Sequence, residues 1–184
     1  MDDVRAIVEA LVFASDAPLS VERLKDILGD MDRKAILEIL QDIELEYRQR
    51  SGGLCLMEVA GGYQFRTKTD YAPWIKKLRG IRPVPISPAA METLSVVAYR
   101  QPVTRPEIDG LRGVESDAVL RSLMVRGLVE PVGRRSTVGL PIEYSTTFLF
   151  LEYFGLSSLE DLPPVSPPLG TGESPPDHDP DHDA

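Results

Sequence analysis

Apolar residues in the first 50 positions recur at helical spacing in three separate runs. Residues 3–14 predict a first helix, and Pro18 ends it because proline removes a helical donor and clashes with the preceding turn. Ser20 then caps a short helix that stops at Gly29, and Asp32 caps a longer helix reaching about residue 49. This order predicts a helix-turn-helix unit. The inward stripe of its first helix contains Val4, Ile7, Val8, Leu11 and Val12.

The same pattern returns 84 residues later, from Ala14 to Ala98. In the second copy Ser87 and Pro88 open the first helix, and Thr104 with Glu107 forms a capping box for the short helix. Ser116 is placed to cap the longer helix, residues 117–126. The sequence therefore predicts a duplicated helix-turn-helix. The matched positions are Ala14, Pro18, Leu19, Ser20, Leu24 and Gly29 with Ala98, Pro102, Val103, Thr104, Ile108 and Gly113.

Each copy is followed by a pair of predicted strands. In the first, residues 54–59 and 63–66 flank a turn at Gly61-Gly62, and a closing helix over 71–79 is expected to point Tyr71, Trp74, Ile75 and Leu78 inward. In the second, residues 128–132 and 142–146 flank a wing at 133–136, and a last helix spans 147–154. The predicted fold is α+β, mainly helical, with two tandem winged helix-turn-helix domains.

The domain boundaries follow from these elements. Residues 1–80 form the first winged-helix domain, 81–86 a short extended linker rich in proline, and 87–162 the second domain. Residues 163–184 are mostly Pro, Asp, Gly and Ser, which cannot bury enough apolar area to offset the entropy lost on ordering. This segment is therefore predicted to be a disordered acidic tail.

The charge distribution limits the possible partners. The chain carries −9 overall, but residues 1–82 and 83–157 carry −1 each and residues 158–184 carry −7. A near-neutral folded part argues against strong nucleic-acid binding, which depends on clustered Lys and Arg. One cysteine excludes an internal disulfide, and no apolar run is long enough to span a membrane. We expect a cytoplasmic protein without membrane contact.

No constellation for catalysis is apparent. The only histidines, His178 and His182, lie in the acidic tail, and Cys55 sits among apolar strand residues where it fills space. The segment from Gly133 to Gly139 lacks the Lys-Ser/Thr pair of a phosphate-binding loop. The sequence therefore predicts a protein that is not an enzyme, with no cofactor and no metal.

The longer helix of the first unit is unusually apolar. Its apolar residues cover an arc of roughly 160°, wider than the stripe of an ordinary surface helix. A small three-helix core has little room for this surface, so we predict a homodimer interface on this helix. The residues assigned to it are Leu37, Ile39 and Leu45.

A dimeric DNA-binding transcriptional regulator is the alternative. Helix-turn-helix units place their longer helix in the major groove, but the first unit has four carboxylates on that helix. The second unit is more permissive, because Arg121, Arg126, Arg134 and Arg135 lie on or near its longer helix and wing. This alternative predicts salt-sensitive DNA binding that depends on Arg121, Arg134 and Arg135.

The second unit resembles segregation and condensation protein B (ScpB). The residues that carry the resemblance are Ser87, Ala89, Tyr144 and Leu159 together with residues 92–94, 98–105, 107–108, 112–114, 127–129, 133–134, 146–147, 154–156 and 161–163. Residues 1–80 resemble the first domain of the same family more loosely. Two positions depart from the family pattern, since Leu140 stands where the family has Arg and Glu143 where it has Leu.

This resemblance implies a non-catalytic subunit of the Smc–ScpA–ScpB chromosome condensation complex, associated with the nucleoid. Such a subunit homodimerises through its first domain, binds the kleisin ScpA, reaches the Smc ATPase through the kleisin, and contacts DNA indirectly or weakly. In this sequence the kleisin-binding expectation falls on the capped turn and the wing. For each residue, maintenance of the fold is an equally good interpretation. The set is Tyr99, Arg100, Gln101, Arg105, Gly133, Arg134, Tyr144, Thr146 and Thr147.

Overall fold

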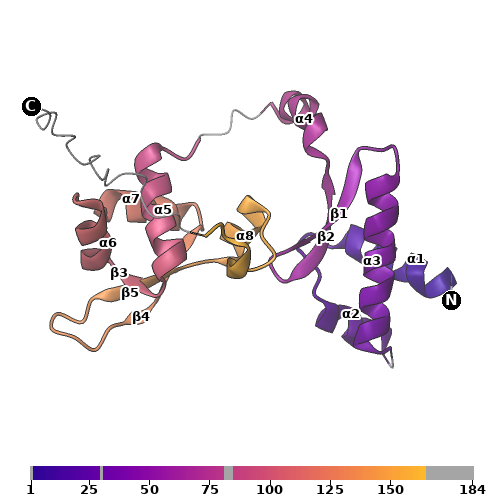
Figure 1. The fold of residues 1–184 in the computed structure, drawn as a ribbon, viewed down its shortest axis with the longest axis horizontal. Coiled ribbons are helices and arrows are strands. Elements are labelled where there is room, and N and C mark those ends of the chain that lie inside the picture. Colours follow the sequence, from indigo (N-terminus) through magenta and orange to yellow (C-terminus); the bar gives the residue numbers. More distant parts are fainter. Residues whose placement is uncertain (1, 30, 81–84, 165–184) are drawn as a thin grey trace, which may run out of the picture.

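A computed structural model describes residues 2–29, 31–80 and 85–164, and Figure 1 shows its two lobes with α8 between them. The linker prediction for 81–84 and nearly all of the predicted tail lie outside the described residues. The elements of the first lobe are α1 (Asp2–Ala14), α2 (Val21–Leu28), α3 (Arg33–Gln49), β1 (Leu54–Val59), β2 (Gly62–Thr67) and α4 (Ala72–Arg79). Those of the second are α5 (Pro88–Arg100), β3 (Val103–Thr104), α6 (Arg105–Arg112), α7 (Asp117–Val125), β4 (Val129–Arg134), β5 (Ile142–Thr146) and α8 (Phe148–Phe154).

The first lobe is built around α3, which contacts α1, α2 and β1. Ile36, Leu40 and Ile43 are fully buried, while Leu37 and Ile39 are half-buried against the same core. Packing on several sides explains the wide apolar arc of this helix. The expectation that this core has little room for the apolar surface of α3 is wrong, because Leu45 is its one exposed large apolar side chain, at 50%.

The hairpin of the first lobe turns one residue earlier than the Gly-Gly pair suggests. Val59 pairs with Gly62, and the two turn residues are Ala60 and Gly61, both at positive φ as a two-residue hairpin requires. Gly62 serves another purpose. A Cβ there would lie 2.8 Å from the carbonyl carbon of Pro18 and 2.9 Å from that of Leu19. Glycine therefore lets β2 approach the turn between α1 and α2.

This close approach adds Leu19 as a third pairing partner at the edge of the β1–β2 hairpin. Leu19 and Tyr63 exchange two backbone hydrogen bonds of 2.9 Å each. The second lobe has the matching pair, Val103 with Tyr144, as the short strand β3 in a sheet ordered β3-β5-β4. Leu19 and Val103 are equivalent in the repeat, so both lobes are winged helices of one plan. The sequence prediction missed β3.

Helix α4 differs most from its expected packing. The structure places no buried residue on it, and Tyr71, Trp74 and Leu78 are 43%, 65% and 86% exposed. The prediction that these side chains point inward is therefore wrong, and only Ile75 is half-buried. The physical reason is that the core of the first lobe is already closed by the three helices and the hairpin. Figure 1 shows α4 standing out from one end of that lobe.

The helix starts of the second lobe are mostly as predicted. The Oγ of Ser87 accepts from the Ala90 N–H at 3.2 Å, and the capping box of Thr104 and Glu107 is complete. Ser116 does not cap α7 through its side chain, contrary to expectation, because its N–H and hydroxyl both donate to Asp109. Asp32 likewise makes no side-chain cap on α3. Ser116 instead ties the turn between α6 and α7 together.

The two lobes meet where the first hairpin touches the end of α8. The N–H groups of Ala60 and Gly61 donate to the carbonyls of Leu156 and Ser157, at 2.8 and 2.9 Å. The guanidinium of Arg66 donates to the Glu152 carbonyl at 2.9 Å. A cation at the carbonyl end of a helix is favoured by the helix dipole. These contacts join residues that the sequence prediction assigns to separate domains.

Tyr63 gives the first lobe a specific sensitivity to alkali. Its ring is 5% exposed, and burial, with the nearby charge of Glu58, raises its pKa to about 12. The neutral phenol is therefore favoured in the folded chain, and its contribution to stability is lost as pH rises from about 10, the ordinary pKa, towards 12. We expect wild type to lose about 1 to 3 kcal/mol more unfolding free energy than Tyr63→Phe between pH 9 and 11.5, by urea unfolding. Equal losses in the two proteins would contradict this.

Candidate partner-binding site

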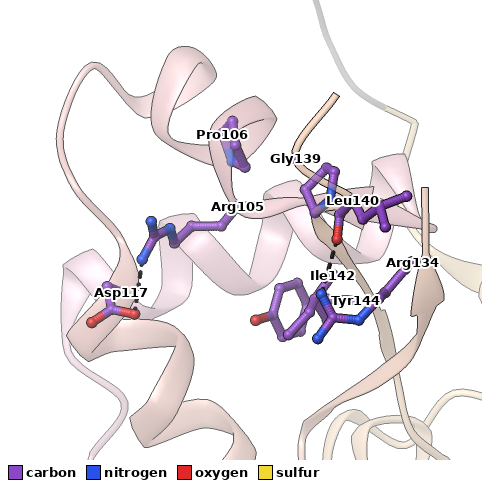
Figure 2. Close-up of a pocket in the computed structure, with 9 residues that line it drawn as sticks. Arg105, Pro106, Asp117, Arg134, Gly139, Leu140, Ile142 and Tyr144 are labelled. Atoms are coloured by element: carbon purple, nitrogen blue, oxygen red, sulfur yellow. Dashed lines mark hydrogen bonds and ion pairs between the residues drawn. The ribbon is translucent and has the colours of Figure 1, made fainter. Parts of the chain in front are cut away.

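A cleft of about 410 Å³ opens between the helix-turn-helix of the second lobe and its wing (Figure 2). Arg105 and Pro106 form the first turn of α6, which begins at this point because Thr104 caps it. Asp117 opens α7 on the same side. The opposite wall comes from the strands and the loop between them, and its residues are Arg134, Gly139, Leu140, Pro141, Ile142 and Tyr144.

Strand geometry explains the apolar floor. Ile142 and Tyr144 are two residues apart on β5, so their side chains lie on the same face of the sheet. Tyr144 also packs against the core of the second lobe, which fixes its ring. Pro141 and the exposed side chain of Leu140 continue this surface along the wing. The cleft therefore has an apolar floor that is fixed by the core of the lobe.

The polar edge is arginine-rich. The Arg105 guanidinium donates to Asp117 at 3.1 Å and lies 3.9 Å from Asp109, while Arg121 lies 2.5 Å from the second oxygen of Asp117. One carboxylate is thus shared by two guanidinium groups. Exposed pairs of this kind are weak and exchange readily with other partners. The edge can accept an incoming carboxylate or peptide carbonyl without a large rearrangement.

The shape of the wing depends on two adjacent arginines. Arg134 donates to the Leu140 carbonyl at 3.0 Å, across a loop in which Leu140 has a φ of +43°. Arg135 points to the other side, donating to Glu143 at 2.8 Å, to the Pro102 carbonyl at 2.9 Å and to Glu107. The bond to Glu143 raises the pKa of Arg135, and the Thr104 N–H lowers that of Glu107. Arg135 therefore fastens the wing to the turn before α6.

Glu143 thus has a structural role in this chain as the partner of Arg135. Leu140, the other departure from the family pattern, adds an apolar side chain to the cleft wall. Strand β4 runs on to Arg134, so Gly133 and Arg134 lie in a strand rather than in the loop expected at 133–136. The loop itself spans residues 135–141.

The structure brings together three of the nine residues predicted to bind the kleisin, namely Arg105, Arg134 and Tyr144. Gly133 lies beside them in β4. Gln101, Thr146 and Thr147 make internal hydrogen bonds instead. The Gln101 amide oxygen accepts from the Thr146 N–H and hydroxyl at 2.7 and 2.9 Å, and Thr147 caps α8.

Tyr99 and Arg100 lie at the end of α5, away from the cleft lining. The Tyr99 hydroxyl donates to the Pro163 carbonyl at 2.6 Å, and Arg100 lines a separate hollow of about 460 Å³ with Leu111. Sequence reasoning missed Asp117, Leu140, Pro141 and Ile142 as cleft residues. The Gly139-Leu140-Pro141 run was the available signal, since such a run marks a fixed bend in a wing.

An apolar groove of about 400 Å³ lies on the first lobe. It is formed by α1 with parts of β1 and β2, and its most exposed large apolar side chain is Phe13, at 69%. Phe13 lies edge-on to Phe65, with ring centroids 6.2 Å apart. Tyr47 closes one side by donating to Glu9 at 2.6 Å, a bond that raises its pKa. The other lining residues are Ala6, Ala10 and Leu54.

The described residues also bear on the DNA-binding alternative and on metal and membrane binding. Of the arginines on which the DNA-binding alternative depends, Arg121 and Arg135 are paired with carboxylates, whereas Arg134 donates to the Leu140 carbonyl. Among residues 2–29, 31–80 and 85–164 no cluster of three His, Cys, Asp or Glu could hold a metal ion. No helix in the described part is long and apolar enough to cross a membrane.

Comparison with known proteins identifies the family. The family model described as segregation and condensation complex subunit ScpB matches residues 6–165. The chain belongs to the ScpB family. It is 44% identical over 161 residues to segregation and condensation protein B of Syntrophotalea carbinolica, covering 88% of this chain and 81% of that one. The ScpB of Geobacillus kaustophilus is 44% identical over 177 residues, covering 94% and 80%.

Solved ScpB structures give the same family by sequence. ScpB from Mycobacterium tuberculosis is 36% identical, covering 84% of this chain and 96% of that one, with a TM-score of 0.40. A dimer of an ScpB N-terminal domain complexed with an ScpA peptide is 31% identical, covering 42% and 95%, with a TM-score of 0.39. TM-scores below 0.5 establish no shared arrangement of the whole chains, so membership of the ScpB family rests on sequence.

Proposed function

We propose that this ScpB family member is a non-catalytic, homodimeric adaptor that binds the kleisin ScpA in an Smc condensation complex. The observation that supports kleisin binding best is the wing cleft, where an apolar floor of Ile142 and Tyr144 meets the exchangeable pair Arg105–Asp117. Such a cleft suits a peptide segment that brings both apolar and acidic side chains. Membership of the ScpB family supports assigning that segment to the kleisin.

The dimer surface is proposed on the first lobe. The groove at Phe13 exposes aromatic and aliphatic side chains without a covering element, whereas Leu37 and Ile39 are already half-buried in the core. Leu45 remains available on the outward side of α3. We place the groove at the centre of the self-association surface and Leu45 on its periphery. Through the kleisin, the dimer reaches the Smc ATPase and acts at the nucleoid in the cytoplasm.

Calorimetric titration of the full chain with the ScpA-like kleisin from the same genome tests the adaptor function. We expect saturable binding with a Kd of about 1 μM or tighter, as for a specific interface of standard size. The stoichiometry should be one kleisin to two chains. Absence of heat at any kleisin concentration that stays in solution would reject the proposal.

The dimer assignment has its own test. Phe13→Glu replaces the exposed ring with a charge in the apolar groove. We therefore expect the dissociation constant of the dimer to rise at least about tenfold. Sedimentation velocity over a range of concentrations measures this. Leu45→Glu should have a smaller effect. If the Phe13→Glu chain self-associates like wild type, the dimer interface lies elsewhere.

A further inference from the structure

Helix α4 presents a surface that the adaptor function does not use. It stands out from the end of the first lobe (Figure 1), and Trp74 and Leu78 are among the most exposed apolar side chains of the described residues. Lys76, Lys77 and Arg79 are exposed on the same short helix. Tyr71 lies at its start, with its ring centroid 6.3 Å from that of Trp74. We call these six residues the α4 surface.

The cations of the α4 surface lack carboxylate partners within the described part of the chain. Elsewhere in the described residues, arginines of both lobes and one lysine, Lys34, form ion pairs with carboxylates. Arg33 and Arg48 are two of these arginines. Among the described residues, no such pair involves Lys76, Lys77 or Arg79. The positive charge of this helix is therefore uncompensated.

The surrounding segment extends this charge. Residues 59–80 contain five cations and one carboxylate, Asp70, which gives +4 in a chain whose net charge is −9. Lys68 donates to the Arg50 carbonyl at 3.0 Å, which brings the loop before β1 alongside. Arg50 in turn lies over the Tyr47 ring rather than against a carboxylate. The positive field is thus concentrated at one end of a near-neutral lobe.

Shape and chemistry together select the partner. A helix that stands out offers no groove for the side chains of an acidic peptide, so the partner must supply the concave surface. Nucleic acid does so, with phosphates along each groove wall and flat bases between them. Lysines contact phosphates as point charges, and exposed aromatic rings stack on bases or sugars.

We infer that the α4 surface binds the phosphate backbone of DNA without sequence preference. Lys76, Lys77 and Arg79 neutralise phosphates, and Trp74 packs against an adjoining base or sugar. In the second lobe, by contrast, Arg121 and Arg135 have carboxylate partners. This site does not rest on kleisin binding. It gives the protein a direct, weak hold on DNA at the end of the lobe opposite α2.

Trp74 is the only tryptophan of the chain, so its fluorescence reports on this surface alone. We would titrate the full chain with a duplex and a single strand of about 30 nucleotides at about 50 mM salt, where phosphate contacts are strongest. Saturable quenching is expected with at least one of them. Tighter binding of the duplex indicates contact at a groove edge, and tighter binding of the single strand indicates base stacking. Both results support backbone binding, and no fluorescence change with either would overturn it.

Matched variants separate a local site from net charge. Lys76→Gln, Lys77→Gln and Arg79→Gln combined should weaken binding at least about tenfold and make the salt dependence shallower by about 2 to 3 in slope. The control combines Arg33→Gln, Lys34→Gln and Arg48→Gln, which removes the same charge from the same lobe. It should change affinity less than about twofold. Equal losses in the two variants would overturn the inference.

Two further results would also overturn it. Polyglutamate that quenches Trp74 with the affinity of DNA would assign the surface to an acidic protein segment. A change in the mass of the triple variant by light scattering, relative to wild type, would assign α4 to self-association. An unchanged mass with weakened DNA binding is the result we expect.

Discussion

Gly62→Ala is expected to lower the free energy of unfolding by about 2 to 3 kcal/mol, a large effect for one added methyl group. The new Cβ would lie under 3 Å from the backbone carbons of Pro18 and Leu19, and backbone cannot rotate away as a side chain can. Relief requires separation of β2 from the turn, which breaks the two hydrogen bonds between Leu19 and Tyr63. Urea unfolding of the full chain measures the loss.

Gly53→Ala is the matched control for this change. Its added Cβ would meet only the Tyr71 ring at 3.6 Å, which is ordinary van der Waals contact. We expect a change within about 0.5 kcal/mol. If Gly62→Ala proved as stable as Gly53→Ala, the close approach of β2 to Leu19 would not exist in solution.

Leu140→Asn is expected to weaken kleisin binding at least about tenfold, since an exposed apolar side chain in a binding cleft carries a large share of the affinity. The substitution suits the backbone, because Asn tolerates the positive φ of 43° at this position better than Leu does. Loss of binding therefore reflects the lost side chain rather than a misfolded wing. Calorimetric titration with the kleisin gives the change in Kd.

Val138→Asn serves as its control. Val138 lies in the same wing loop and is fully exposed, but it does not line the cleft. The Kd of the Val138→Asn chain for the kleisin should lie within about twofold of the wild-type Kd, as expected for a residue outside an interface. Equal weakening by the two substitutions would show that the wing acts as a whole, and equal retention would place the kleisin elsewhere.

The fold was largely predictable because its signals are local. Caps such as Ser87 and the Thr104–Glu107 box, and stops such as Gly113, act within a few residues of their own position. Because the unit is repeated, the same caps and stops occur twice in the sequence and support each other. The strand β3 was missed because two residues carry no periodicity, and its pairing with β5 is set by tertiary contact.

The errors at α4 and α3 have one cause. Helical spacing shows which residues share a face, but it does not show how many other elements compete for that face. On α3 several neighbours cover the apolar arc, and on α4 none covers Trp74 or Leu78. The predicted turn at Gly61-Gly62 was wrong for a related reason. Glycine is needed at position 62 because the backbone packs against Pro18, 44 positions earlier in the chain.

The candidate site was predictable only in part. Arg105, Arg134 and Tyr144 carried the family resemblance and do meet at the cleft. Leu140 and Ile142 did not stand out, because an apolar residue at a wing is indistinguishable from core in sequence alone. Gln101 and Thr146 also carried the resemblance, but they bond to each other, which a one-dimensional pattern cannot reveal.

Light scattering of the purified chain, alone and mixed with the ScpA-like kleisin from the same genome, is the sharpest test of the adaptor function. We expect a mass of two chains for the protein alone, and a discrete complex of two chains with one kleisin in the mixture. A chain that elutes separately from the kleisin at every ratio, whatever its own mass, would contradict the adaptor function.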